Sequence, residues 1–391
     1  MQNLNIILFD KTVWEDLLPL TFTRSAADLR IGITTLREKW ETFFPSTGIL
    51  TEEYLAGKYS YSQSEDSLYI NVAVIPNDDL VEAISNLQFG QLIAKNGFII
   101  AFRKNEFTTD ITAFQSSIEY NLEIKAVKNT WDIFELNDFA IRSDFPQIIQ
   151  HKKSASISTT NRVLGEDNIF IEEGAKLEFA TINASEGPVY IGKNAEVMEG
   201  ALIRGPLALC EHACIKMGAK IYGATTIGPW CKVAGEIHNS VLTGYSNKGH
   251  DGFLGNAVLG EWCNIGADSN NSNLKNNYDL VKLWAYKEGR FVSTGLQFCG
   301  LIMGDHSKCG INTMFNTGTV VGVSANIYGS GFPRNFIPSF SWGGALGFKT
   351  YNLDKAIETA KIVYSRRKLE LSASEINILQ EVFDRTAKYR K

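Results

Sequence analysis

The stretch from Ile191 to Val233 reads IGKNAEVMEGALIRGPLALCEHACIKMGAKIYGATTIGPWCKV, and one aliphatic residue recurs in it every six residues. The recurring positions are Ile191, Val197, Ile203, Leu209, Ile215, Ile221, Ile227 and Val233. A period of six matches neither the 3.6-residue turn of a helix nor the alternation of a plain strand. It is the period of a parallel β-helix whose flat faces are one hexapeptide long. We therefore expect each aliphatic side chain to stack on its counterpart in the next coil.

The same period continues beyond Val233 with two interruptions. Small residues that would fill tight corners lie four positions after most aliphatic ones, at Ala195, Ala201, Ala213, Ala219, Thr225 and Cys231. A second frame runs through Val241, Phe253, Leu259 and Ile265, and a third through Met303, Cys309, Phe315 and Val321. The breaks, near residues 235–252 and 268–300, predict loops that leave the prism, and such insertions usually carry function in repeat scaffolds.

The rest of the chain has ordinary helix and strand patterns. Strands are expected at residues 4–9 and 68–74 and helices at 33–44 and 78–87, and this alternation indicates an α/β layer fold. Residues 353–390 have helical spacing with a break at 372–374, where Ser374 is expected to cap the last helix. The sequence thus predicts an α/β domain at 1–150, a parallel β-helix at 151–345 and C-terminal helices at 346–391.

Composition excludes several classes of protein. The 391 residues include 38 basic and 43 acidic ones, a net charge of −5, which lacks the basic excess of a nucleic-acid-binding protein. The opening MQNLNIILFD fits a buried strand and neither a signal peptide nor a membrane span, so we expect a cytoplasmic protein with no membrane partner. Six cysteines without a CxxC pair predict reduced thiols. No metal-ligand pattern and no Ser-His-Asp order are visible, so no metal site is expected, and hydrolases and metalloenzymes are excluded.

The segment HDGFLGNAVLGEWCNIGADSNNSNLK, from His250 to Lys275, lies at the interruptions. It resembles the signature of the glucosamine-1-phosphate N-acetyltransferases, bifunctional enzymes that also make UDP-N-acetylglucosamine. The matching positions are His250, Gly255, Gly260, Asn264, Gly266, Ala267 and Asn273, and the segments 238–242 and 300–312 resemble the family as well. The resemblance implies a left-handed β-helix, a homotrimer with sites between neighbouring subunits, and acetyl-CoA as co-substrate.

The resemblance also implies roles for individual residues. It implies His250 as the catalytic residue; Lys216, His238, Phe253, Asn264 and Asn273 as contacts of a sugar phosphate; and Ala267, Asn312 and Thr313 as contacts of acetyl-CoA. Phe253 and His238 replace a tyrosine and a lysine of the family, and Lys216 stands near the place of an arginine, so an acceptor other than the family's stays open. Asn264 and Asn273 also fit an asparagine ladder of the kind common in β-helix turns.

Acyl transfer to an amine needs a base, and imidazole suits this role because it titrates near neutral pH. The oxyanion of the tetrahedral intermediate needs a donor placed in advance, which a backbone N–H of Gly266–Ala267 would supply. Without the motif, a single histidine in a loop such as His250 is more often a polar surface group.

A second resemblance covers LLPLTFTRSAADLRIG, from Leu17 to Gly32. It is similar to a segment of the sugar nucleotidyltransferases, and implies Arg24, Arg30 and Lys39 as nucleotide contacts and Mg²⁺ as a cofactor if the domain is active. The glycine-rich turn that would cradle phosphate after the first strand is replaced by FDKTVWED. A structural role for the three basic residues stays open. The whole arrangement is similar to sugar nucleotidyltransferase-like proteins of Bacteroidetes.

Three functions follow as hypotheses. The first is N-acetylation of an amino-sugar phosphate by acetyl-CoA, with or without nucleotidyl transfer in the N-terminal domain. The second is sugar-1-phosphate nucleotidyl transfer alone, with the β-helix only for trimerisation or regulation. The third is a non-catalytic scaffold that binds a nucleotide sugar. In each case the partner is a small sugar phosphate or nucleotide sugar.

Overall fold

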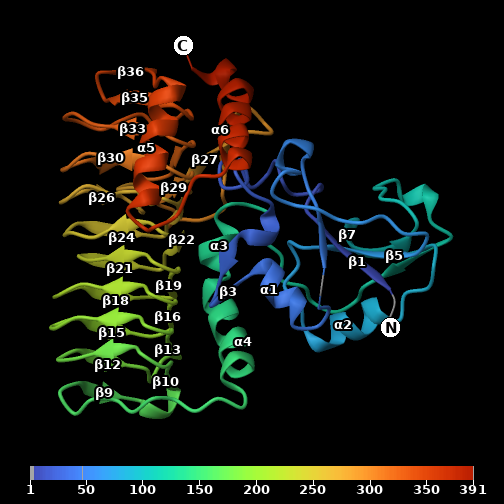
Figure 1. Cartoon of the computed structure of the whole chain (residues 1–391), viewed down its shortest axis with the longest axis horizontal. Coiled ribbons are helices and arrows are strands. Elements are labelled where there is room, and N and C mark those ends of the chain that lie inside the picture. Colours follow the sequence, from blue (N-terminus) through green and yellow to red (C-terminus); the bar gives the residue numbers. More distant parts are fainter. Residues whose placement is uncertain (1–3, 46, 391) are drawn as a thin grey trace. The chain divides into compact units, whose positions relative to one another are not determined.

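The computed structural model describes residues 4–45 and 47–390 and contains two compact units (Figure 1). The first comprises residues 1–17, 24–29 and 34–129, and the second comprises 18–23, 30–33 and 130–391. The division therefore falls after residue 129, whereas the sequence suggested 150. Helices α3 (Asp132–Glu135) and α4 (Asn137–Ile149) belong to the second unit, as do the C-terminal helices expected to form a separate part.

The first unit is the expected α/β layer, built on a mixed six-stranded sheet in the order β4-β1-β5-β7-β6-β8. Its strands are β1 (Asn5–Phe9), β4 (Gly48–Leu50), β5 (Ser67–Asn71), β6 (Gln91–Lys95), β7 (Phe98–Lys104) and β8 (Ser116–Glu119). Helix α1 (Leu36–Glu41) is shorter than predicted because Thr35 and Glu38 form a capping box that fixes its start. Helix α2 (Asp78–Ser85) begins at the Asn77 cap, as expected.

The second unit contains a parallel β-solenoid of about 10 turns, residues 162–343, and the predicted fold class is confirmed. Figure 1 shows its strands stacked in register along one axis. One face is a nine-stranded sheet: β10 (Ile169–Ile171), β13 (Val189–Ile191), β16 (Leu207–Leu209), β19 (Thr225–Ile227), β22 (Val241–Gly244), β25 (Val258–Glu261), β29 (Leu301–Met303), β32 (Thr319–Val321) and β34 (Phe336–Ile337).

The other two faces complete the prism. The second face holds β9 (Arg162–Leu164), β12 (Thr181–Asn183), β15 (Leu202–Arg204), β18 (Lys220–Tyr222), β21 (Glu236–His238) and β24 (Phe253–Gly255), followed by the pair β26 (Asn270–Asn271) and β31 (Met314–Phe315). The third face holds β11 (Lys176–Leu177), β14 (Glu196–Val197), β17 (Cys214–Ile215), β20 (Lys232–Val233), β23 (Asn247–Lys248), β30 (Lys308–Cys309), β33 (Asn326–Ile327), β35 (Ser341–Gly344) and β36 (Gly347–Thr350).

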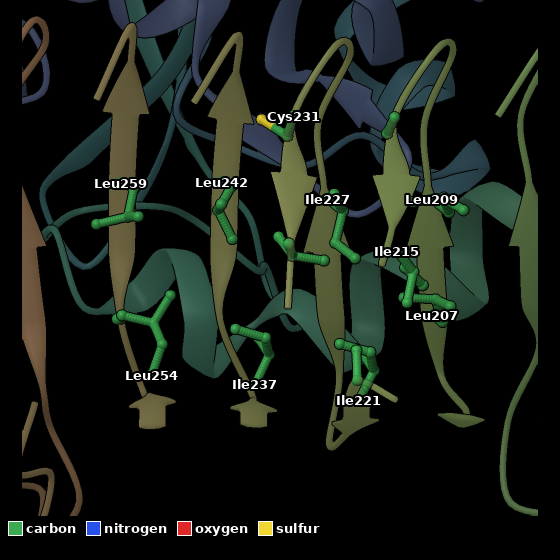
Figure 2. Close-up of a cluster of buried hydrophobic side chains, with 14 of the residues drawn as sticks. Leu207, Leu209, Ile215, Ile221, Ile227, Cys231, Ile237, Leu242, Leu254 and Leu259 are labelled. Carbon is green, nitrogen blue, oxygen red and sulfur yellow. The ribbon is translucent and has the colours of Figure 1, made fainter. Parts of the chain in front are cut away.

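The six-residue period marks the core of the solenoid. All eight aliphatic positions from Ile191 to Val233 lie in one buried cluster, each no more than 3% exposed. Figure 2 shows part of this cluster, with Leu209, Ile215, Ile221 and Ile227 pointing into the interior. The coil length explains the pattern, because Val189 pairs with Leu207 and Leu207 with Thr225, eighteen residues apart, which is three hexapeptides.

The first predicted interruption is a shortened coil and not an excursion. Thr226 pairs with Val241, only fifteen residues on, and the chain continues through β21, β22 and β23 without leaving the sheets. The shorter coil shifts the six-residue frame, and Leu242 and Leu254 are therefore the residues that belong to the core cluster. The prediction that Val241 and Phe253 occupy these core positions was wrong. A shift of one residue turns a strand side chain to the opposite face.

The second predicted interruption is confirmed as an excursion. Val258 pairs with Ile302, forty-four residues later. The extra chain includes an antiparallel hairpin of β27 (Lys282–Ala285) and β28 (Arg290–Ser293). Trp284 on this hairpin stacks on Phe336 at 4.2 Å between ring centroids.

Helix α4 packs on the nine-stranded face of the solenoid. Its Ile141 and Phe145 form a buried cluster with Phe170, Tyr190 and Ala208. The Asn137 side chain at its start donates to the carbonyl of Ala224 at 2.8 Å and accepts from the Gly32 N–H at 2.8 Å. Because of these contacts with the solenoid, α4 belongs to the second unit.

Helices α5 (Leu353–Ser365) and α6 (Ala373–Arg385) end the chain. The cap of α6 is Ser372, whose hydroxyl accepts from the Glu375 N–H in a capping box, so the prediction of Ser374 was wrong. Helix α5 contacts a solenoid corner through Tyr364, which stacks on Trp262 at 4.0 Å. Trp262 in turn stacks on Tyr245 from the preceding coil at 4.3 Å. Trp262 is thus buried, at 4% exposure, between residues of its own chain.

The six cysteines are all buried, and none pairs with another. Burial raises the pKa of several of these thiols, including that of Cys214 to about 11. Within the residues that the structure describes, no helix has the length and apolar character needed to cross a bilayer.

Candidate functional site

A cavity of about 740 Å³ lies on the third face of the solenoid, within the size range of small-molecule sites. Its floor is a column of outward-facing residues from successive coils, because register pairs Lys232 with Asn247, Asn247 with Asn264 and Asn264 with Lys308. Helix α5 and the turn after it supply one wall. The other lining residues are Lys216, Tyr245, Gly249, His250, Trp262, Cys263, Ile265, Gly266, Ala267, Ile311, Val363, Arg366 and Arg367.

The cavity is strongly cationic. Five basic side chains line it, namely Lys216, Lys232, Lys308, Arg366 and Arg367, and none of the described lining residues is acidic. The Lys308 ammonium donates to the carbonyl of His306 at 2.9 Å, and burial lowers the pKa of Lys308. A ligand with several phosphate groups would offset the mutual repulsion of these cations.

His250 lies at one edge of this cavity. It belongs to the corner that joins β23 on the third face to β24 on the second face, and its side chain is exposed. Lys216 lies beside it, and its ammonium donates to the Gly249 carbonyl at 3.2 Å. The predicted base therefore faces both a cationic cavity and solvent.

Asn264 and Ala267 line the cavity with polar groups, a side-chain amide and a backbone N–H. Within the described chain, neither the Asn264 side-chain amide nor the Ala267 N–H has a hydrogen-bond partner. The neighbouring Gly266 N–H is already used, since it donates to the Cys309 carbonyl at 3.1 Å. Of the pair expected to supply an oxyanion donor, Ala267 is the one whose N–H is free.

The remaining predicted sugar-phosphate residues lie on the second face. His238 and Phe253 project from β21 and β24, and burial lowers the pKa of His238. The His238 ring lies 4.7 Å from that of Tyr222, and the Asn273 amide donates to the Asn256 side chain at 2.8 Å. The structure thus brings His250, Lys216, Asn264 and Ala267 together and separates His238, Phe253 and Asn273 from the cavity.

Asn312 and Thr313 lie two coils beyond the His250 corner and do not line the cavity. The Asn312 N–H donates to the Ala267 carbonyl at 2.8 Å. Thr313 is buried, and its hydroxyl donates to the Gly310 carbonyl at 2.9 Å. Their neighbour Ile311 is the residue of this corner that lines the cavity.

Sequence reasoning missed most of the cations. Lys232 and Lys308 carry a usable signal, because each directly precedes a buried position of the repeat, Val233 and Cys309, and so must point outward from the same face. Arg366 and Arg367 carry none, because no repeat places the end of α5 against a particular coil.

Of the three predicted nucleotide contacts, Arg24 and Lys39 belong to the first unit and Arg30 to the second. In the first unit Arg24 and Lys39 are buried, 3% and 6% exposed, and the Lys39 ammonium donates to Thr34 at 3.1 Å. Arg30 belongs to the second unit, where its guanidinium donates to the Ile33 carbonyl and lies 4.0 Å from the Cys210 sulfur.

A buried carboxylate, Asp10, occupies the end of β1, where the missing glycine-rich turn would begin. Its Oδ2 accepts from the Ser25 hydroxyl at 2.7 Å, the Ala26 N–H at 2.8 Å and the Thr51 hydroxyl at 2.9 Å. These donors lower its pKa, but burial outweighs them and raises the pKa of Asp10 from 3.8 to about 6. Among described residues, no group of three or more His, Cys, Asp or Glu side chains is arranged to hold a metal ion.

Asp10→Asn is expected to remove a pH dependence from the stability of the first unit. Because the folded-state pKa is raised, the folded state binds the proton more tightly, and stability falls as pH rises from about 4 to above 6. The loss is about 3 kcal/mol for a shift of two pKa units. Urea unfolding at pH 4.5 and 7.5 should capture about 2 kcal/mol of this loss, because part of it has already occurred at pH 4.5. Asp66→Asn is the control, because the pKa of Asp66 is lowered by Arg103 and its small contribution has the opposite sign.

The comparisons with known proteins cover the two parts of the chain separately. Residues 6–153, well under half of the chain, match the family model for sugar nucleotidyl transferases. No curated protein matches significantly. A solved structure of Arabidopsis UDP-N-acetylglucosamine acyltransferase is 16% identical and aligns over 55% of this chain and 80% of its own, with a TM-score of 0.23. The family match supports a transferase of the sugar-nucleotide class, and a TM-score this low supports no conclusion.

Proposed function

We propose that the protein is an N-acetyltransferase that transfers the acetyl group of acetyl-CoA to an amino-sugar phosphate. The observation that supports this proposal is the convergence on one cavity of His250, the unpartnered Ala267 N–H and five basic side chains without an acidic one. Acetyl-CoA carries three phosphate groups and so suits a cationic cavity, whereas a neutral or cationic donor would not.

The reaction assigns a role to each group. The amine of the acceptor attacks the thioester carbonyl, a C–N bond forms, and the imidazole of His250 takes the proton that the amine loses. The Ala267 N–H donates to the oxyanion of the tetrahedral intermediate. When the C–S bond breaks, coenzyme A leaves as a thiolate and the imidazolium returns the proton to it. The Asn264 amide hydrogen-bonds the acceptor.

The proposal includes a homotrimer. His238, Phe253 and Asn273 lie on one face of the prism and the cavity lies on another, with the His250 corner between them. An acceptor that contacts both sets is best held where the second face of one copy meets the third face of another. Closed symmetric association is the usual way for a chain to combine two of its own faces.

A second candidate is nucleotidyl transfer to a sugar 1-phosphate by the first unit. The family match to residues 6–153 favours it. The buried Asp10 and the buried side chains of Arg24 and Lys39 count against it, because phosphate binding needs accessible donors. In that case the solenoid would serve assembly or regulation, and the protein would not transfer acetyl groups.

Arg366→Ala is expected to weaken acetyl-CoA binding roughly tenfold, because it removes one charge-assisted hydrogen bond to phosphate at an exposed position. Calorimetric titration of the purified protein with acetyl-CoA measures the effect, and the affinity should fall with added salt. Lys176→Ala, an exposed lysine on the same face outside the cavity, should bind as the wild type does. If the wild type binds no acetyl-CoA but binds a nucleotide sugar, the second candidate or the scaffold hypothesis replaces this one.

A further inference from the structure

A lysine occupies a place in the solenoid core that other coils give to apolar residues. Register pairs Val233 with Lys248 on the third face, so Lys248 stands in the inward column that contains Val197, Ile215 and Val233 before it. Its side chain is fully buried, at 0% exposure. Burying an ammonium group is costly unless it is well paired, so the residue calls for a functional explanation.

The Lys248 ammonium binds the corner that carries His250. It donates to the His250 carbonyl at 2.5 Å and to the Asp251 carbonyl at 2.8 Å. Lys216 donates to the preceding carbonyl, that of Gly249, from the other side. Three consecutive carbonyl groups are therefore held by two ammonium groups, one from inside the solenoid and one from the cavity.

The corner has little other freedom. Gly252 follows it with φ of +113°, and a Cβ there would lie 2.1 Å from the Ser269 carbonyl oxygen. The Asp251 carbonyl accepts a further bond from the Asp268 N–H at 3.1 Å. Hence the end of the corner at Gly252 is fixed by backbone packing, and the direction of the His250 peptide depends on the lysine.

Stability alone does not account for Lys248. Removing the buried charge would remove its desolvation cost, which offsets the loss of its hydrogen bonds to the two carbonyls, so a small net effect on stability is expected. Burial lowers the pKa of Lys248 to about 8, which reflects that cost despite the nearby Asp251 and Asp268. An apolar residue at this position would continue the column of its neighbours.

We propose that Lys248 is a positioning residue for His250: by binding the carbonyls of His250 and Asp251 from within the core, it fixes the imidazole at the edge of the cavity. This inference rests on the proposed function for its effect on rate, but the geometric claim stands apart from it. Misplacing a reacting group by about 1 Å can cost on the order of a hundredfold in rate.

Lys248→Met tests the proposal, since methionine has similar length and no donor. We expect kcat for acetyl transfer to fall about ten- to a hundredfold, with the Kd for acetyl-CoA within twofold and the melting temperature unchanged or higher. Ile327→Met, a near-isosteric change at another position of the inward column, should leave kcat unchanged. Should Lys248→Met fail to fold, Lys248→Gln, whose amide is too short to reach both carbonyls, should give the same fall in kcat.

A second measurement needs no substrate. The chain has only five histidines, so the imidazole resonance of His250 can be assigned by its loss in His250→Ala. One sharp resonance in the wild type should become broadened or multiple in Lys248→Met. A folded variant with wild-type kcat and an unchanged resonance would overturn the proposal. If the wild type shows no acetyl transfer, the proposed function fails, and the resonance alone decides whether Lys248 holds the corner.

Discussion

Replacing His250 with alanine is expected to lower the rate of acetyl transfer by about a hundred- to ten-thousandfold, the usual effect of losing a general base. The side chain is exposed at a corner outside the core, so the melting temperature and acetyl-CoA binding should stay nearly unchanged. Steady-state kinetics with acetyl-CoA and glucosamine 1-phosphate measures the rate. Saturating substrate should not restore it.

The size of the loss distinguishes two roles for His250. If the imidazole only donated a neutral hydrogen bond to the sugar, its removal would cost roughly 0.5–1.5 kcal/mol, or about tenfold. His151→Ala, an exposed histidine outside the cavity, is the matched control and should retain full activity. Wild-type activity in His250→Ala would show that the residue does not act as the base.

Ile215→Asp is expected to unfold the solenoid. Ile215 is fully buried in the inward column, and aspartate there would place an unpaired charge in the core. We expect a loss of more than about 4 kcal/mol, which belongs to the largest class of single-residue effects. Far-ultraviolet circular dichroism during thermal unfolding measures it.

Met217→Asp is the matched control for this variant. It introduces the same charge two residues later, at a side chain that is 70% exposed, so its effect should stay within about 0.5 kcal/mol. A soluble Ile215→Asp protein with the wild-type melting temperature would mean that the aliphatic column does not stabilise the solenoid.

The core of the solenoid was predictable from sequence because each coil repeats the same structural position. Ile191, Leu209 and Ile227 occupy equivalent places in successive coils, so their spacing is visible without any knowledge of tertiary contacts. The prediction failed at Val241 and Phe253, where a coil loses three residues. The repeat pattern does not show at which position of the coil these three residues are missing.

The candidate site was predictable only in part, because its residues come from different kinds of structure. His250 and Ala267 lie at the corners of consecutive coils, and Asn264 lies on the third face just before Ala267. The spacing of the motif from His250 to Lys275 was enough to group these three residues. Arg366 reaches the cavity from α5, a helix whose docking position depends on the contact between Tyr364 and Trp262. Such a contact between distant segments leaves no local pattern in the sequence.

Helix α4 shows a similar limit of sequence patterns. It precedes the first coil of the solenoid, and its Ile141 and Phe145 bury their side chains on the solenoid. A helical pattern identifies an apolar face without identifying the surface that covers it.

Because Tyr364 on α5 stacks on Trp262, one wall of the cavity can form only after the ribosome has synthesised α5. A solenoid assembles coil upon coil through contacts between neighbours, so its stack can form while the ribosome is still adding residues. Helix α5 emerges only after that stack, and it brings Val363, Arg366 and Arg367 to a wall that the coils alone do not provide. We therefore expect the His250 corner to form before α5 completes the wall of the cavity.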